Sequence, residues 1–141
     1  MMQPKVSILI PVYNRENLVK TAIESALSQT YENIEIIIVD NKSTDNTWEV
    51  LKQYASKDGR IKIFQNETNI GPVLNWKKCL EYSNGEYVKF IFSDDWIEKD
   101  FVEKTAYYLN NKEVAFVYTP AAIINGSEKH ISYNKLFSDT I

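Results

Sequence analysis

The sequence predicts an α/β fold built around a mainly parallel sheet with helices on both faces. Short β-branched runs alternate with amphipathic segments of helical length along most of the chain. The intervals between them are short and regular, as in βαβ units with right-handed crossovers. The first, second and fourth runs are almost continuously apolar, which is typical of parallel strands that are buried on both faces.

Five strands are expected. They span residues 6–10, 34–39, 61–64, 87–92 and 114–118. Pro11 ends the first strand, because proline cannot donate a hydrogen bond to a sheet ladder. The fifth strand could continue beyond Pro120.

Four helices are expected, each bounded by residues that start or stop helices. They cover roughly residues 14–27, 43–59, 71–84 and 98–109. Asn14 is a suitable cap for the first helix, and the second is expected to end near Gly59. Gly71 followed by proline opens the third. Within that helix, Trp76 is expected to pack against the core.

Length and composition limit the possible functions. With 141 residues, 44% hydrophobic and 25% charged, the chain has the composition of an ordinary globular domain. A net charge of −3 gives no basis for nucleic-acid binding, which depends on clustered lysine and arginine. The single cysteine, Cys79, suits a reducing compartment. Neither a signal peptide nor an apolar run of ~20 residues is present. We expect a cytoplasmic protein, and peripheral association with the inner face of the membrane stays open.

Two adjacent carboxylates, Asp94 and Asp95, stand directly after the apolar fourth strand. Because buried charge is costly, such a pair needs solvent, a cation or hydrogen-bond donors. In open parallel sheets, ligands bind at the carboxyl ends of the strands. Two acids at that edge suit a hard divalent metal, which prefers oxygen ligands and often shares them with a diphosphate. Asp94 and Asp95 are therefore the candidate metal ligands.

Further candidate residues are expected at the same edge, in the segments that end or follow the first three strands. The candidates are Pro11, Val12, Tyr13, Asp40, Asn41, Asn69 and Gly71. Together with the acids they offer carboxylates, amides and an aromatic ring around one crevice. A nucleotide needs such a mixture: a ledge beside its base, an acceptor for its N–H and a cation for its diphosphate.

Each of these candidates also has a simpler explanation. Asp40 could cap the turn before the next helix, and Tyr13 could be a packing residue. Asn69 belongs to a residue type that marks loops in many proteins. Asp94 and Asp95 could be favoured by the dipole of the helix that follows them. Their shared position at one edge of the sheet favours the ligand site.

Two classes of nucleotide-binding protein are excluded, because the chain has neither a glycine-rich dinucleotide turn nor a phosphate-binding P-loop. A receiver-like signalling domain is disfavoured as well. Such domains need acids after strands one and three, where this chain has Pro11-Val12-Tyr13 and Gln65-Asn66.

A series of short segments occurs in a specific order between about residues 5 and 110. The segments are 6–14 (VSILIPVYN), 26–31 (ALSQTY), 35–45 (EIIIVDNKSTD), 69–71 (NIG), 85–87 (GEY) and 93–95 (SDD). Each is common alone, but the ordered set is specific, and it resembles family 2 glycosyltransferases with the GT-A fold. The resemblance implies a GT-A (Rossmann-like) three-layer sandwich with a mainly parallel central sheet.

The resemblance also implies roles for the candidate residues. In the family, the residue matching Asp40 binds the nucleotide base, and a ledge matching 11–13 flanks that base. The acids matching Asp94 and Asp95 hold the ribose and a Mg2+ or Mn2+ that bridges the diphosphate of an activated sugar. An inverting, metal-dependent glycosyltransferase is therefore implied, with a nucleotide-diphosphate sugar as donor and an unidentified glycan or lipid-linked acceptor. Polysaccharide or cell-envelope glycan synthesis is the expected setting.

The chain departs from the family pattern at two positions. Many members carry a further aspartate where this chain has Phe92, so the metal ligand could be Asp94 or Asp95. The frequent Asp-Asp-Gly-Ser of the second signature is Asp-Asn-Lys-Ser here, so Asn41 replaces one carboxylate.

Residues 1–125 are expected to form the nucleotide-sugar-binding GT-A domain. Residues 126–141 are expected to be a polar tail or the start of an acceptor-binding segment. No residue is assigned as the general base that deprotonates the acceptor hydroxyl in the family. Two hypotheses stay open: the chain is the donor-binding half of a longer glycosyltransferase, or it is a catalytically silent module that binds nucleotide sugars.

Overall fold

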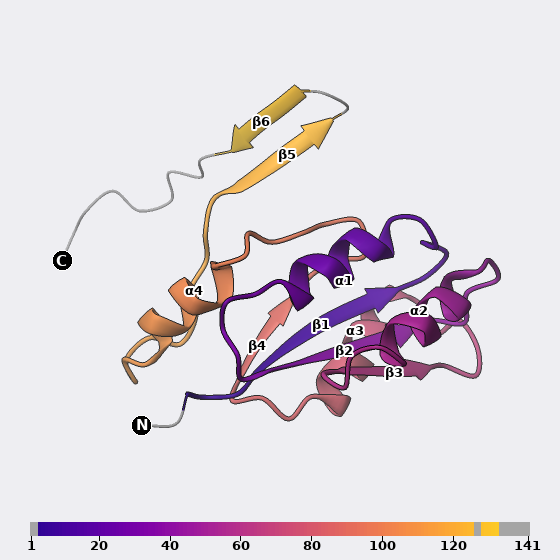
Figure 1. Ribbon diagram of the computed structural model, residues 1–141, viewed down its shortest axis with the longest axis horizontal. Coiled ribbons are helices and arrows are strands. Elements are labelled where there is room, and N and C mark those ends of the chain that lie inside the picture. The colour runs from indigo at the N-terminus through magenta and orange to yellow at the C-terminus, as the bar shows by residue number, and fades with distance from the viewer. Residues whose placement is uncertain (1–2, 126–127, 133–141) are drawn as a thin grey trace. The chain divides into compact units, whose positions relative to one another are not determined.

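The computed structural model describes residues 3–125 and 128–132. Within this part of the chain, the main sheet has four parallel strands in the order β3-β2-β1-β4 (Figure 1). The strands are β1 (Val6–Val12), β2 (Ile34–Asp40), β3 (Ile61–Gln65) and β4 (Tyr87–Phe90). The predicted parallel sheet is thus confirmed, with the fourth strand shorter than expected. The prediction that Pro11 ends the first strand is wrong, because β1 continues through Pro11 and pairs with β2 as far as Val12.

The register of the sheet decides which residues meet at its carboxyl edge. Val12 at the end of β1 pairs with Asp40 at the end of β2, and Asp40 pairs with Gln65 at the end of β3. On the other side of β1, Leu9 pairs with Phe90 of β4. The segments that follow these four strands therefore emerge along one edge.

The helices complete a three-layer arrangement. The four helices of the described residues are α1 (Val19–Leu27), α2 (Thr47–Ala55), α3 (Pro72–Tyr82) and α4 (Phe101–Leu109). Residues of α1, α2 and α4 share one buried cluster with one face of the sheet, whereas α3 packs on the opposite face through Cys79. No helix in the described residues is long and apolar enough to cross a membrane.

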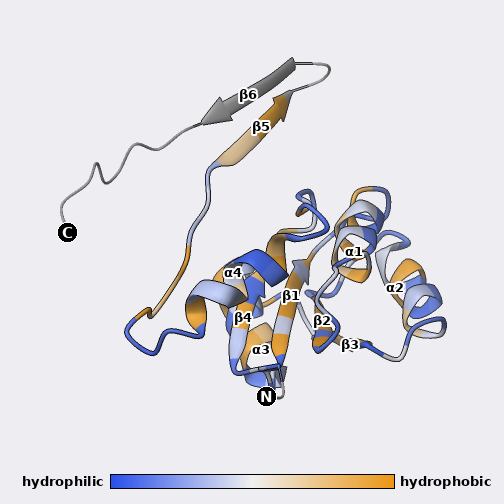
Figure 2. Ribbon diagram, turned by 60° about the vertical axis from the view of Figure 1, so that its left-hand side comes forward, coloured by the Kyte–Doolittle hydropathy of each residue, from blue (hydrophilic) through white to orange (hydrophobic). Residues whose placement is uncertain are grey.

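Burial on both faces explains why β1 and β2 are apolar without interruption. In β1, Ile8 and Ile10 face the cluster of α1, and Leu9 between them faces α3; all three side chains are fully buried. Burying an isoleucine or leucine side chain stabilises the fold by roughly 1.5–3 kcal/mol. The helices are amphipathic, and α1 and α2 accordingly show both blue and orange segments in Figure 2.

Asn14 does not cap α1, contrary to the sequence-based prediction. The helix begins at Val19, and Asn14 adopts a left-handed conformation with φ of 51°. Its side-chain oxygen instead accepts a hydrogen bond of 2.8 Å from the backbone N–H of Thr44. Asparagine tolerates this backbone conformation better than most residues, so it is used here to join two loops.

The chain divides into two compact units, residues 1–106 and 107–141. In the second unit, β5 (Ala121–Asn125) pairs antiparallel with β6 (Glu128–Ser132). The predicted strand at 114–118 is wrong, because this segment has no regular structure and Phe116 is 75% exposed. Its continuous run of apolar residues therefore does not mark a strand.

The expected tail 126–141 contains β6, and the rest of it lies outside the described residues. The predicted functional division between 1–125 and 126–141 stays a prediction.

Candidate functional site

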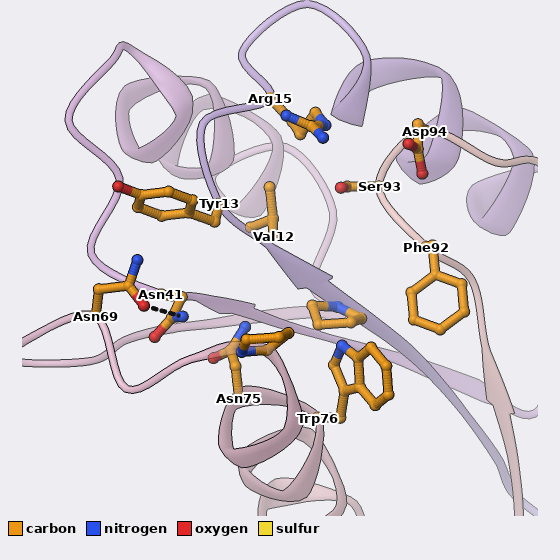
Figure 3. Close-up of a pocket in the computed structure, with 12 residues that line it drawn as sticks. Val12, Tyr13, Arg15, Asn41, Asn69, Asn75, Trp76, Phe92, Ser93 and Asp94 are labelled. Carbon is orange, nitrogen blue, oxygen red and sulfur yellow. Dashed lines mark hydrogen bonds between the residues drawn. The ribbon is translucent and has the colours of Figure 1, made fainter.

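A cavity of about 370 Å³ lies at the carboxyl edge of the sheet (Figure 3). Segments that follow β1, β2, β3 and β4 all contribute to it. Its lining contains six of the predicted site residues, namely Pro11, Val12, Tyr13, Asn41, Asn69 and Asp94. Further lining residues are Arg15, Pro72, Asn75, Trp76, Phe92 and Ser93. The sequence-based prediction that these strand ends meet around one crevice is therefore confirmed for those six residues.

Asp40 stands at the same edge but does not line this cavity. Its fully buried carboxylate accepts hydrogen bonds from the backbone N–H and the hydroxyl of Ser43. The amide of Gln65 donates to it over 2.8 Å. The simpler explanation, a cap for the turn after β2, thus describes the observed contacts of Asp40. Direct recognition of a base by Asp40 stays a prediction.

Four asparagine side chains form a hydrogen-bonded network at the cavity, and three of them, Asn41, Asn69 and Asn75, line it. Asn41 donates to Asn69 Oδ1 over 2.8 Å and accepts from Asn66 Nδ2 over 2.9 Å. Asn66 also donates to Asn75 Oδ1, and the buried Asn75 donates to the carbonyl of Val39. Because Asn41 and Asn75 each donate and accept, the network fixes the loop between β3 and α3 against the end of β2.

Gly71 shapes this loop without lining the cavity. Its φ of 82° is unfavourable for residues with a side chain, and its N–H donates to Asn69 Oδ1 over 2.9 Å. Pro72 follows in the first turn of α3, where a missing N–H costs nothing. The sequence-based prediction that Gly71 opens α3 is confirmed.

The loop after β1 is locked to the loop after β2. The backbone N–H of Asn14 donates to Ser43 Oγ, and that of Arg15 donates to Thr47 Oγ1, both over 2.9 Å. This arrangement presents the ring of Tyr13, 41% exposed, and the guanidinium of Arg15 at the cavity (Figure 3). Arg15 was not among the predicted site residues, although it stands two residues beyond the predicted ledge.

The two acids after β4 differ in position. Asp94 lines the cavity, whereas Asp95 does not. Burial and the neighbouring Asp94 raise the pKa of Asp95, while Lys89 opposes this shift. The helix-dipole explanation for the pair fails, because α4 begins only at Phe101.

The described residues contain no group of three or more His, Cys, Asp or Glu side chains that could hold a metal ion. A magnesium ion, however, is usually held by one or two carboxylates together with substrate phosphates and water. Asp94, exposed on the cavity wall beside the hydroxyl-bearing Ser93, offers hard oxygen donors of this kind. The residues present therefore fit a divalent ion that is shared with a diphosphate.

An aromatic wall was missed by sequence analysis. Trp76 was expected to pack against the core, but it lines the cavity and is 39% exposed. Its ring centroid lies 5.3 Å from that of Phe92. Helical spacing alone could not distinguish these roles, because the face of α3 that packs on the sheet is set by Cys79 and Asn75.

Comparison with known proteins agrees with this geometry. The family model for glycosyl transferase family 2 matches residues 7–140. The chain belongs to this family. It is 37% identical over 114 residues to the Escherichia coli UDP-Glc:alpha-D-GlcNAc-diphosphoundecaprenol beta-1,3-glucosyltransferase WfaP, covering 81% of this chain and 45% of the relative. It is 40% identical over 103 residues to glycosyltransferase GlyA of Streptococcus pneumoniae, covering 73% of this chain and 15% of the relative.

Solved structures support the fold assignment. The crystal structure of S. aureus TarS 1-349 in complex with UDP-GlcNAc superposes with a TM-score of 0.71 at 31% identity, covering 77% of this chain and 32% of that one. The predicted GT-A sandwich is thereby confirmed. This family 2 chain spans less than half the length of each of these three proteins.

Proposed function

We propose that this chain forms the donor-binding half of an inverting, metal-dependent glycosyltransferase. The observation that carries the proposal is the shared cavity of Asp94, the Asn41–Asn69 amides and the ledge at 11–13. A carboxylate at one end and amides with an aromatic ring at the other suit a nucleotide-diphosphate sugar. The relatives support this donor class, because TarS was solved with UDP-GlcNAc and WfaP is named for UDP-Glc.

The base and the diphosphate are assigned to different parts of the cavity. Tyr13 and the amides of Asn41 and Asn69 flank the base, with Asp40 and Gly71 holding the loops behind them. Asp94, aided by Asp95, holds a Mg2+ or Mn2+ ion against the diphosphate. When bound, such an ion stabilises the charge of a departing diphosphate. Arg15, a cation on the same cavity wall, adds positive charge for the phosphates.

The acceptor is proposed from the relatives. WfaP is named for a lipid-linked diphosphoundecaprenol acceptor. We propose a glycan or lipid-linked acceptor of cell-envelope synthesis, handled on the cytoplasmic side of the membrane. Co-sedimentation with the membrane fraction of cells that produce the protein, reversed by high salt, tests the peripheral association.

Calorimetric titration with UDP and with GDP tests the donor proposal. We expect binding of at least one nucleotide to strengthen by about tenfold or more when Mn2+ is present. Asp94→Asn should abolish this enhancement. Asp100→Asn is the matched control, because that carboxylate pairs with Lys104 and does not line the cavity. A folded wild-type protein that binds neither nucleotide with the metal would refute the proposal.

A silent binding module is the second candidate, because no general base is assigned in the described residues. Binding alone does not separate the two candidates, so release of UDP from UDP-glucose is the deciding assay. Sustained, metal-dependent release by this polypeptide would exclude the silent module. Tight donor binding without any release or transfer would favour it.

A further inference from the structure

Two aromatic side chains form one wall of the cavity. Trp76 comes from the second turn of α3, and Phe92 comes from the segment directly after β4. Their ring planes are tilted by 55°, and Phe92 also lies 6.5 Å from the ring of Phe90. Figure 3 shows the two rings on one side of the cavity, with Tyr13 and Asn69 on the other.

This wall keeps apolar surface in contact with solvent. Trp76 is 39% exposed and Phe92 is 41% exposed. Exposed apolar surface that lines a cavity commonly marks a binding site. In the described residues, the indole N–H of Trp76 makes no hydrogen bond to the protein, so it is free to donate to a ligand.

The position of Trp76 is fixed in advance of binding. The preceding residue, Asn75, is buried and anchored to the carbonyl of Val39 over 3.0 Å. Asn66 donates to the same amide over 2.8 Å. This anchoring holds the turn of α3 that carries the indole. It therefore lowers the entropic cost of ordering Trp76 when a ligand binds.

The chemistry of the wall suits a sugar ring. One face of a sugar presents C–H groups, which pack on aromatic faces, and its rim presents hydroxyl groups, which need hydrogen-bond partners. The wall offers both kinds of contact, because the indole N–H and the oxygens of Ser93 and Asp94 lie around the same cavity. A phenylalanine at position 92 provides a flat apolar surface and no carboxylate.

We propose that Trp76 and Phe92 form a stacking platform for a sugar ring of the donor, next to its diphosphate. The inference rests on the proposed function, which puts the diphosphate at Asp94 and the base near Tyr13. Two rings adjoin a diphosphate in such a donor, the ribose and the transferred sugar, and both present C–H faces. Trp76 and Phe92 are thus specificity-determining residues for the donor.

A single-tryptophan protein tests the platform. The chain has three tryptophans, so Trp48→Phe combined with Trp96→Phe leaves Trp76 as the reporter. The fluorescence of Trp76 is followed during two titrations in the presence of Mg2+. The first uses the free diphosphate, UDP or GDP, and the second uses the matching sugar nucleotide, UDP-glucose or GDP-mannose. The nucleotide is the one that the wild-type protein binds. A change with the free diphosphate places the ribose on the platform. A change with the sugar nucleotide alone places the transferred sugar there.

Affinity measurements on Trp76→Leu and Phe92→Leu provide a second test of the platform. Each substitution should weaken binding of the ligand that stacks by roughly tenfold. Tyr82→Leu is the matched control: this ring is also on α3 and 36% exposed, but it stacks on Phe64 and does not line the cavity. It should bind like the wild type. Circular dichroism checks folding, and either platform variant suffices if the other unfolds.

The platform is refuted if the wild type binds the ligands while both leucine variants keep wild-type affinity and Trp76 emission stays constant. A change in oligomeric state of these variants without a change in affinity also refutes it, and would assign the wall to a protein contact. Failure of the wild type to bind any nucleotide removes the proposed function and the platform together.

Discussion

Asn41 Nδ2 donates a hydrogen bond of 2.8 Å to Asn69 Oδ1, and this bond ties the end of β2 to the loop before α3. Asn41 Oδ1 meanwhile accepts from the backbone N–H of Ile70 over 3.0 Å. Asn41 therefore fixes this loop through both its amide nitrogen and its amide oxygen. The family often has a second aspartate at this position. A carboxylate at the same position could not donate to Asn69.

Asn41→Ala should weaken both the fold and the site. It leaves the N–H of Ile70 and the amides of Asn66 and Asn69 without these partners, which should cost about 1–3 kcal/mol of unfolding free energy. Nucleoside diphosphate binding should weaken several-fold, because the loop is no longer fixed. Urea denaturation and calorimetry measure the two effects. Asn84→Ala is the control, since that exposed side chain donates a hydrogen bond to the carbonyl of Tyr82 and does not line the cavity. Equal losses in both variants would contradict the assignment.

Asp40→Asn should be destabilising even without any ligand. The wild-type carboxylate accepts from Ser43 and Gln65 and is fully buried, whereas an amide NH2 would face those donors. We expect a loss of about 1–3 kcal/mol in thermal or urea denaturation of the free protein. Unchanged stability combined with lost nucleotide binding would instead show that Asp40 serves the ligand alone.

Glu35 should make the fold sensitive to acid. Although burial opposes it, hydrogen bonds from Lys5, Ser7 and Lys62 and from the N–H of Asn84 lower the pKa of Glu35 from 4.5 to about 2. A lowered pKa in the folded state contributes stability above pH 4.5, and this contribution is lost as the pH falls toward about 2.

The contribution of Glu35 at neutral pH should be up to roughly 3 kcal/mol. Glu35→Gln should remove it and flatten the pH dependence of unfolding in the acid range. Chemical denaturation of both proteins between neutral and strongly acidic pH measures the difference. An identical acid dependence in the variant would contradict the role of this buried carboxylate.

Gly85 should tolerate no side chain, because its place beside β1 is filled. A Cβ there would lie 2.5 Å from the backbone nitrogen of Ser7 and 2.8 Å from the carbonyl oxygen of Tyr87. Gly85→Ala should therefore destabilise the fold by about 2 kcal/mol or more, since backbone atoms would have to move. Gly59→Ala, where a Cβ meets nothing within 4 Å, should change stability by less than about 1 kcal/mol. Similar melting temperatures for the two variants would show that the close approach of Gly85 to Ser7 does not exclude a side chain at position 85.

Local patterns predicted the parallel core well because β1 and β2 are buried on both faces, and such strands must be apolar throughout. The same reasoning placed Pro11 and Asp94 at one edge. It offered the turn cap by which Asp40 accepts from Ser43, three residues further on. It did not predict the hydrogen bond from Gln65, because that contact joins segments that are distant in the sequence. It also misassigned residues 114–118, since a short run of apolar residues does not reveal whether a neighbouring strand exists.

The aromatic wall illustrates a second limit. Trp76 and Phe92 are 16 positions apart, and only the fold brings their rings together. Helical spacing on α3 suggested packing for every large residue, yet a helix on the surface of a sheet buries only one stripe. The departure at Phe92 from the family pattern was visible in the sequence, but its partner was not.

Paramagnetic broadening by Mn2+ tests the central claim most directly. NMR spectra of the 15N-labelled protein would be recorded with UDP or GDP and substoichiometric Mn2+, with Mg2+ as the diamagnetic reference. We expect strong broadening of the amides of Ser93, Asp94 and Asp95, with sharp signals from Asn84 at the opposite edge of the sheet. Broadening centred elsewhere, or none that depends on the nucleotide, would contradict a metal-chelated donor at Asp94.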